Sequence, residues 1–149
     1  MRLFIATPVT LPFYQIIKQK LSPYIQGKWV EGYNLHLTHK FIGDDNPDNW
    51  KIDLNIPNEK IEIKDFGIFN NKILYMKAIS PHIDSIAKQL NVKNFTPHIT
   101  LCRIKQLDDK LFEKLKTLDF SYKIEFEVNL YSSILTKKGP IYKKIYKYL

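Results

Sequence analysis

The sequence predicts an α+β domain built largely from antiparallel strands. Three observations support this fold class. Most β-rich runs are short and end at Pro, Gly, Asn or Asp, helical periodicity appears in three places, and the two kinds of segment alternate irregularly along the chain. About eight strands and three helices are expected on this basis. The 149 residues fit a single domain over 1–149, with room for two small lobes that share a core.

The first segments are a strand, a helix and two more strands. Residues 3–7 form a β-rich run that stops at a proline, and apolar residues then recur at helical spacing over 13–21. A short strand is predicted at 29–30 and a longer one over 34–42. Gly43 and the polar run behind it close the longer strand as a turn.

A hairpin and a second helix are predicted next. The runs 61–69 and 72–79 are rich in β-branched and aromatic residues, and Asn70-Asn71 separates them. Because asparagine tolerates positive φ, this dipeptide suits a tight hairpin turn. A helix is predicted after Pro81, since apolar residues repeat at helical spacing up to Leu90.

The last third of the chain is predicted to contain an extended segment, a helix and a closing hairpin. Residues 97–104 are extended, and 108–118 place apolar residues on one helical face behind an acidic first turn. Two β-rich runs, 124–136 and 141–149, surround the turn signal at 137–140. The chain is therefore expected to end in a hairpin.

Composition indicates a globular protein with an anionic partner. Hydrophobic residues make up 44% and charged residues 26% of the chain, enough to bury a sizeable core. The net charge of +8 attracts phosphates or nucleic acid at long range. A lysine-rich soluble surface is the alternative explanation, because lysine is spread over the whole sequence.

The single cysteine and the absence of long apolar runs bear on location. Cys102 has no partner for an internal disulfide and rules out a multi-cysteine metal site, which fits a reducing cytosol. The apolar run near the N-terminus, Leu3–Ala6, is too short for a signal peptide. We therefore expect a soluble cytoplasmic protein that does not enter a membrane.

One short pattern occurs twice in predicted strands, His36-Leu37-Thr38 and His98-Ile99-Thr100. Side chains alternate along a strand, so each copy presents an imidazole and a hydroxyl on one face while its central residue points to the core. Two such strands facing each other would line a groove with two imidazoles and two hydroxyls. One histidine can activate water and the other protonate a leaving oxygen, while the threonines hydrogen-bond phosphoryl oxygens.

Structural roles are the alternative interpretation of these residues. A single histidine on a half-buried strand is usually a packed or surface residue, and threonine is a good strand former. Two copies in matching contexts favour chemistry. His39 and His82 lack that context and are interpreted as structural or surface residues. Two histidines without a third ligand at suitable spacing make a weak zinc site, so no metal is expected.

Longer stretches around these motifs resemble the 2H phosphoesterases, and within them the RNA 2′,3′-cyclic phosphodiesterases, also described as 2′-5′ RNA ligases. The similar stretches share strand character and run nearly end to end. They are Arg-Leu-Phe-Ile-Ala (2–6), Lys-Trp-Val (28–30), Asn-Leu-His-Leu-Thr-His-Lys-Phe-Ile-Gly (34–43), Phe-Thr-Pro-His-Ile-Thr-Leu-Cys-Arg (95–103), Leu-Tyr-Ser-Ser-Ile-Leu (130–135) and Gly-Pro-Ile-Tyr (139–142).

The resemblance implies a bilobal fold with a pseudo-twofold axis, in which two mainly antiparallel sheets line a central groove and helices lie outside. It implies hydrolysis of an RNA 2′,3′-cyclic phosphate to a 2′-phosphomonoester without a metal or other cofactor. It also implies that His36 is the proton donor, that His98 is the proton acceptor, and that Thr38 and Thr100 bind phosphate. The residues alone require one acid and one base and do not say which is which.

Four further residues are candidates for substrate binding. Lys40 is expected on the motif face of its strand and Arg103 follows the second motif, so either can meet phosphates, arginine as the better bidentate partner. Their alternatives are a solvated strand edge and a structural salt bridge. Trp29 and Tyr142 could stack on a nucleobase, although such aromatics more often belong to a core.

Other functions remain open at this point. The chain could be a non-catalytic RNA-binding module that uses its charge and aromatic residues. It could also be a related enzyme that joins RNA through 2′-5′ linkages or cleaves 2′-5′ oligonucleotides, since the same acid and base serve both directions. The expected partner is RNA or a nucleotide with a 2′,3′-cyclic phosphate end. No protein partner is implied, and a monomer is expected.

Overall fold

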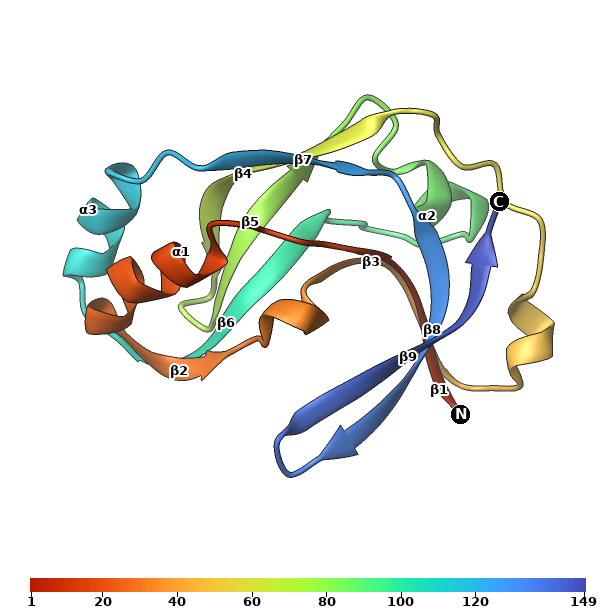
Figure 1. Cartoon of the computed structure of the whole chain (residues 1–149), viewed down its shortest axis with the longest axis horizontal. Helices are drawn as coiled ribbons and strands as arrows, with labels where there is room; N and C mark the ends of the chain where they lie inside the picture. The colour runs from red at the N-terminus through yellow and green to blue at the C-terminus, as the bar shows by residue number, and fades with distance from the viewer.

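The computed structural model describes residues 1–149 and contains nine strands and three α-helices (Figure 1). The strands are β1 (Arg2–Pro8), β2 (Ile25–Trp29), β3 (His36–Asp44), β4 (Lys60–Phe69), β5 (Ile73–Ile79), β6 (His98–Leu107), β7 (Ser121–Glu125), β8 (Val128–Thr136) and β9 (Gly139–Tyr148). The helices are α1 (Tyr14–Leu21), α2 (Ser85–Gln89) and α3 (Lys110–Lys116). The predicted α+β class is confirmed.

The strands form one nine-stranded sheet in the order β7-β4-β5-β6-β3-β1-β8-β9, with β2 added on β6. All of its pairings are antiparallel. The prediction of two separate sheets therefore needs correction. The two halves are joined between β3 and β6, where Leu37 pairs with Ile99. In Figure 1 β3 lies near the centre, and the β7-β4-β5-β6 half lies mainly to its left.

A single cluster of 27 buried residues extends through both halves. Alternation explains how it forms, since β5 buries every second residue along most of its length and β4 buries Ile61 and Ile63. On α1, Tyr14, Ile17 and Leu21 are buried at helical spacing. Each such aliphatic side chain contributes roughly 1.5–3 kcal/mol through burial.

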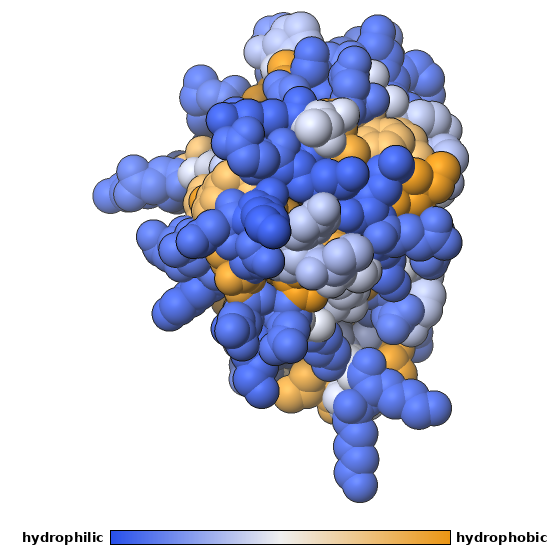
Figure 2. Space-filling model, turned by 90° about the vertical axis from the view of Figure 1, so that its left-hand side faces the viewer, coloured by the Kyte–Doolittle hydropathy of each residue, from blue (hydrophilic) through white to orange (hydrophobic).

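Helices α1 and α3 lie together at one end of the molecule (Figure 1). Seen from that end, the surface is mostly hydrophilic, with small and separate hydrophobic areas (Figure 2). The end that carries these two helices therefore has the character of a solvated surface. None of the helices is long and apolar enough to cross a membrane.

Local signals located one turn correctly and missed two other features. Asn70 and Asn71 have φ of 49° and 57°, so the predicted β4–β5 hairpin turn is confirmed. The run 124–136 proves to be two strands, because β7 ends at Glu125 and β8 begins at Val128. Helix α2 is shorter than the predicted helix, since residues 81–84 form a turn ahead of it.

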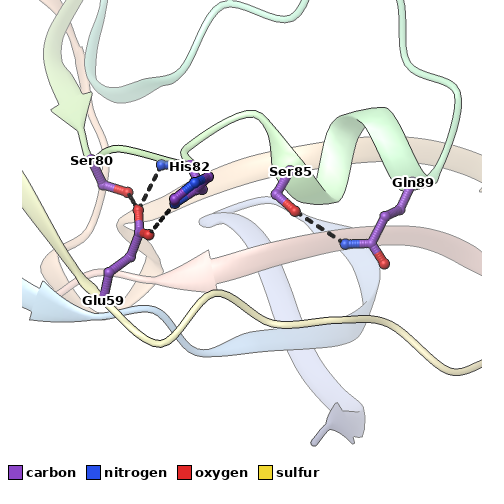
Figure 3. Close-up of polar contacts among 5 residues, drawn as sticks. All are labelled: Glu59, Ser80, His82, Ser85 and Gln89. Atoms are coloured by element: carbon purple, nitrogen blue, oxygen red, sulfur yellow. Dashed lines mark hydrogen bonds and ion pairs between the residues drawn. The ribbon is translucent and has the colours of Figure 1, made fainter.

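A polar clasp holds the irregular segment before β4 against the turn before α2 (Figure 3). Glu59 accepts hydrogen bonds from the Ser80 hydroxyl and from the His82 backbone N–H, the latter at 2.7 Å. The His82 ring nitrogen Nδ1 lies 2.7 Å from the same carboxylate. Every contact of His82 described here is structural, which agrees with the sequence-based interpretation of this residue.

Candidate active site

Strands β3 and β6 bring the two His-x-Thr motifs together at the centre of the sheet. Through the antiparallel Leu37–Ile99 pair, His36 comes opposite Thr100 and Thr38 comes opposite His98. Opposite residues share a face, so the two imidazoles and the two hydroxyls form a square with like groups on its diagonals. All four line one groove of about 350 Å³.

Both imidazoles are oriented by the same hydrogen bond. Nδ1 of His36 lies 2.7 Å from the backbone oxygen of Asn34, and Nδ1 of His98 lies 2.7 Å from that of Thr96. A carbonyl oxygen only accepts, so Nδ1 carries the proton in each ring. Nε2 is then a bare acceptor when the ring is neutral and a donor when it is charged. Each histidine can therefore act as base or acid through Nε2.

Aromatic pairs support each histidine from opposite halves of the molecule. The His36 ring lies 5.3 Å from the Phe4 ring and 5.2 Å from the Tyr142 ring, measured between centroids. The His98 ring lies edge-on to Phe69 at 5.3 Å and to Tyr75 at 5.6 Å. These contacts restrict how the imidazoles can turn, which keeps their Nε2 atoms in a fixed arrangement.

The groove is electropositive and disfavours a charged His36. Burial is the largest cause that lowers the pKa of His36 below 6.5, and the charges of His98 and Arg103 lower it further, while the hydrogen bond to Asn34 opposes them. Burial also raises the pKa of Tyr142, against the effect of Arg103. Lys28 and Lys138 line the groove as well, so its cations are placed to attract an anion.

Three of the four additional candidates lie at the groove. Trp29, Arg103 and Tyr142 all line it. The Trp29 ring also packs edge-on against Tyr14 at 6.4 Å, so part of it belongs to the core packing. No ion pair in the structure involves Arg103, so the salt-bridge alternative for this residue does not apply.

Lys40 lies on the other face of the strand. A β-bulge skips one residue, so that Ala6 pairs with Thr38 but Ile5 pairs with Lys40. The bulge breaks the alternation and turns Lys40 away from the motif face, where its ammonium donates to the Leu90 carbonyl at 3.4 Å and lies 5.8 Å from the Trp50 ring. Phe41 takes the groove position instead.

His39 is a packed residue on the face opposite the groove. It is 1% exposed, its ring stacks on Phe126 at 5.7 Å, and its Nε2 lies 2.8 Å from the hydroxyl of Thr7. Its Nδ1 is buried without a partner. Burial lowers the pKa of His39 to about 4, so the ring is neutral at pH 7.

Sequence reasoning missed several groove residues that come from distant segments. They share exposure to the groove or contact with a histidine, and they are Phe4, Lys28, Asn34, Phe41, Phe69, Tyr75, Leu135 and Lys138. Only the strand register brings them to the site. The β-bulge that turns Phe41 into the groove has no signal in the sequence, because a bulge depends on how the strand pairs with its neighbour.

The arrangement can bind a phosphoryl group and transfer protons on both sides of it. Two hydroxyls are available to its oxygens, and two imidazoles with free Nε2 atoms stand on the other diagonal. No group of three or more His, Cys, Asp or Glu side chains is placed to hold a metal ion.

Comparison with known sequences gives matches over most of the chain. The pattern of the LigT like Phosphoesterase family matches residues 73–142. The RNA 2′,3′-cyclic phosphodiesterase of Methanocaldococcus jannaschii is 33% identical and aligns with 97% of this chain and 98% of its own length. The RNA 2′,3′-cyclic phosphodiesterase of Aquifex aeolicus is 32% identical over 85% of this chain and 83% of its own.

Solved structures share the fold at lower identity. The TT0787 protein of Thermus thermophilus superimposes with a TM-score of 0.74 at 24% identity, covering 99% of this chain and 97% of that one. Escherichia coli LigT complexed with NADP⁺ gives a TM-score of 0.70 at 21% identity, covering 99% and 96%. Agreement over nearly the full length extends to both halves of the sheet.

Proposed function

Because this chain belongs to the LigT-like phosphoesterase family, we propose that it hydrolyses RNA 2′,3′-cyclic phosphate ends to 2′-phosphomonoesters by two-histidine acid–base catalysis. The observation that carries the proposal is the square of His36, Thr38, His98 and Thr100 in one groove. The names of the two relatives described above support the choice of substrate.

The reaction needs one proton removed and one supplied. Nε2 of His98 takes a proton from water as the water oxygen forms a bond to phosphorus. The bond between phosphorus and the ribose 3′ oxygen breaks, and Nε2 of His36 gives its proton to that oxygen. The phosphate stays on the 2′ oxygen. His98 then releases its extra proton to solvent and His36 takes up a proton from solvent, which returns both rings to their starting states.

The two threonines stabilise the negative charge that develops on the phosphoryl oxygens. Their hydroxyls occupy the diagonal between the imidazoles, so both can donate hydrogen bonds to non-bridging oxygens. Arg103 adds a positive charge on the same groove wall. These interactions strengthen as the phosphoryl oxygens gain charge, which favours the transition state over the bound substrate.

The environment of His36 is compatible with the role of proton donor. Burial and neighbouring positive charge lower its pKa, which makes the charged ring a stronger acid once it has formed. A bound anionic phosphate opposes these effects and favours the charged ring. His36 therefore acquires its proton most readily when substrate is present, and it gives that proton up easily during ring opening.

The test is hydrolysis of adenosine 2′,3′-cyclic phosphate with EDTA present. We expect adenosine 2′-phosphate as the product, distinguished from the 3′ isomer by ³¹P NMR. His82→Ala is the matched histidine control, since its exposed ring bonds to Glu59 and does not line the groove, and it should keep turnover within a few-fold. Binding of substrate without turnover would favour an RNA-binding module, and activity restored only by added metal would contradict the mechanism.

A further inference from the structure

A second chamber of about 420 Å³ lies beside the groove, and His36 lines both. Five side chains line both spaces, so the two spaces adjoin; they are His36, Phe41, Arg103, Leu135 and Tyr142. The far part of the chamber is lined by Arg2, Gly43 and Ser133, from β1, β3 and β8. The hydrolytic step proposed above leaves this far part without a role.

The only two arginines of the protein both line this chamber. The chain contains 23 Lys and Arg, and all except Arg2 and Arg103 are lysines. Both arginines are exposed, and no ion pair in the structure involves either one. Asp44, which faces Arg2 in the β1–β3 register, forms no ion pair with it either. Two unpaired guanidinium groups in one chamber suit phosphate oxygens, which they can bind in bidentate fashion.

Strand geometry places Arg2 one step farther from the catalytic centre than Arg103. Arg2 and Phe4 are two residues apart on β1, so their side chains leave the same face about 7 Å apart. The Phe4 ring lies 5.3 Å from the ring of His36. Arg103 lines both spaces, whereas Arg2 lines only the second one.

Apolar side chains line the same chamber as the exposed arginines. Phe41 is 77% exposed and Leu135 is 84% exposed, and both line the chamber as well as the groove. Large apolar side chains that stay exposed beside a charged site often mark a binding surface. Aromatic and aliphatic walls next to guanidinium groups fit a nucleotide, whose base is flat and whose phosphates are charged.

We propose that this chamber holds the phosphate on the 5′ side of the terminal nucleotide, with Arg2 as its principal ligand. The inference rests on the proposed function, since it assumes that the cyclic phosphate occupies the square of His36, Thr38, His98 and Thr100. Arg103 then lies between the two phosphates. The preferred substrate is a nucleotide that carries a 5′ phosphate, as in an RNA chain, over a nucleoside cyclic phosphate without one.

The test compares adenosine 2′,3′-cyclic phosphate with the same compound carrying a 5′ phosphate. The measured quantity is the ratio of kcat/KM for the phosphorylated to the unphosphorylated substrate. We expect a ratio of about ten or more in the unmodified protein, because one hydrogen bond between two charged groups typically improves binding by at least that factor. Arg2→Gln should bring the ratio close to one, and Arg2→Lys should keep part of it, because lysine retains the charge but not the bidentate geometry.

Lys20→Gln is the control for net charge, because Lys20 is exposed on α1 and does not line either space. Its ratio should equal that of the unmodified protein. Equal rates on both substrates, or a preference that survives Arg2→Gln, would overturn the inference while leaving the proposed hydrolysis intact. A drop in the ratio with Lys20→Gln as large as with Arg2→Gln would show diffuse attraction and overturn it as well. Failure to hydrolyse either substrate would instead contradict the proposed function.

Discussion

Acid should destabilise the protein through His39, and the loss should begin at a pH above the range in which the protein's carboxylates titrate. The ring is buried between aromatic neighbours, and its Nε2 is held by the Thr7 hydroxyl. In the unfolded chain the same imidazole takes up a proton near pH 6.5. Since the native state binds fewer protons than the unfolded state below that pH, the free energy of unfolding must fall as the pH is lowered.

The size of the effect follows from the two pKa values. Burial lowers the pKa of His39 from 6.5 to about 4 in the folded protein. One pKa unit corresponds to about 1.4 kcal/mol, so the full difference is worth about 3 kcal/mol. Loss begins as the pH falls below 6.5 and is complete near pH 4. A single domain is typically stable by 5–15 kcal/mol in total, so this loss is large.

Urea unfolding between pH 7.5 and 4 measures the effect, with His39→Leu as the comparison. Leucine does not titrate, so the difference in unfolding free energy between the two proteins should change by about 3 kcal/mol over this range. His36, whose pKa is also lowered, and the carboxylates are common to both proteins and cancel. Parallel stability curves would show that the His39 ring can be protonated in the folded state and would refute the reasoning.

Three further predictions concern the groove and its frame. The pH profile of kcat/KM should be bell-shaped, and its alkaline limb should begin below pH 6.5, because the lowered pKa of His36 removes the required proton early in the free enzyme. Steady-state rates across pH check this, and a rate still rising at pH 10 would contradict it. Thr38→Ala and Thr100→Ala should each cost roughly 1.5–3 kcal/mol in kcat/KM without moving the bell; a shifted bell would show that they tune the histidines instead. Gly27→Ala should lower the melting temperature, since its Cβ would lie 2.3 Å from the Arg103 carbonyl and force β2 off β6; an unchanged value would show that β2 moves freely.

The sequence predicted what is decided locally. Period-two alternation and proline, glycine and asparagine signals place most of the strands and the Asn70-Asn71 turn. The two His-x-Thr motifs predicted the face that lines the groove in the same way, because alternation along one strand is enough to put a histidine and its threonine together. Local signals of this kind do not depend on which strands become neighbours.

What the sequence could not give depends on pairing between distant strands. The pairing of Leu37 with Ile99 connects the two expected sheets into one, and no local pattern in either strand predicts this pairing. The bulge beside Thr38 likewise exchanges Lys40 for Phe41 in the groove, because β1 and β3 together set that register. The position of Arg2 in the second chamber, on which its proposed role rests, likewise emerges only when β1 is placed beside β3 and β8.

The most direct test of two-histidine catalysis measures the proposed acid, His36, and the proposed base, His98, separately. His36→Ala and His98→Ala are assayed on adenosine 2′,3′-cyclic phosphate and on bis(4-nitrophenyl) phosphate, whose leaving group departs without a proton. Both variants should lose about 10²–10⁴ in rate on the cyclic phosphate. On the nitrophenyl ester, His36→Ala should approach the unmodified rate, whereas His98→Ala should remain impaired because water still needs a base. Near-normal turnover of the cyclic phosphate by either variant would contradict two-histidine catalysis.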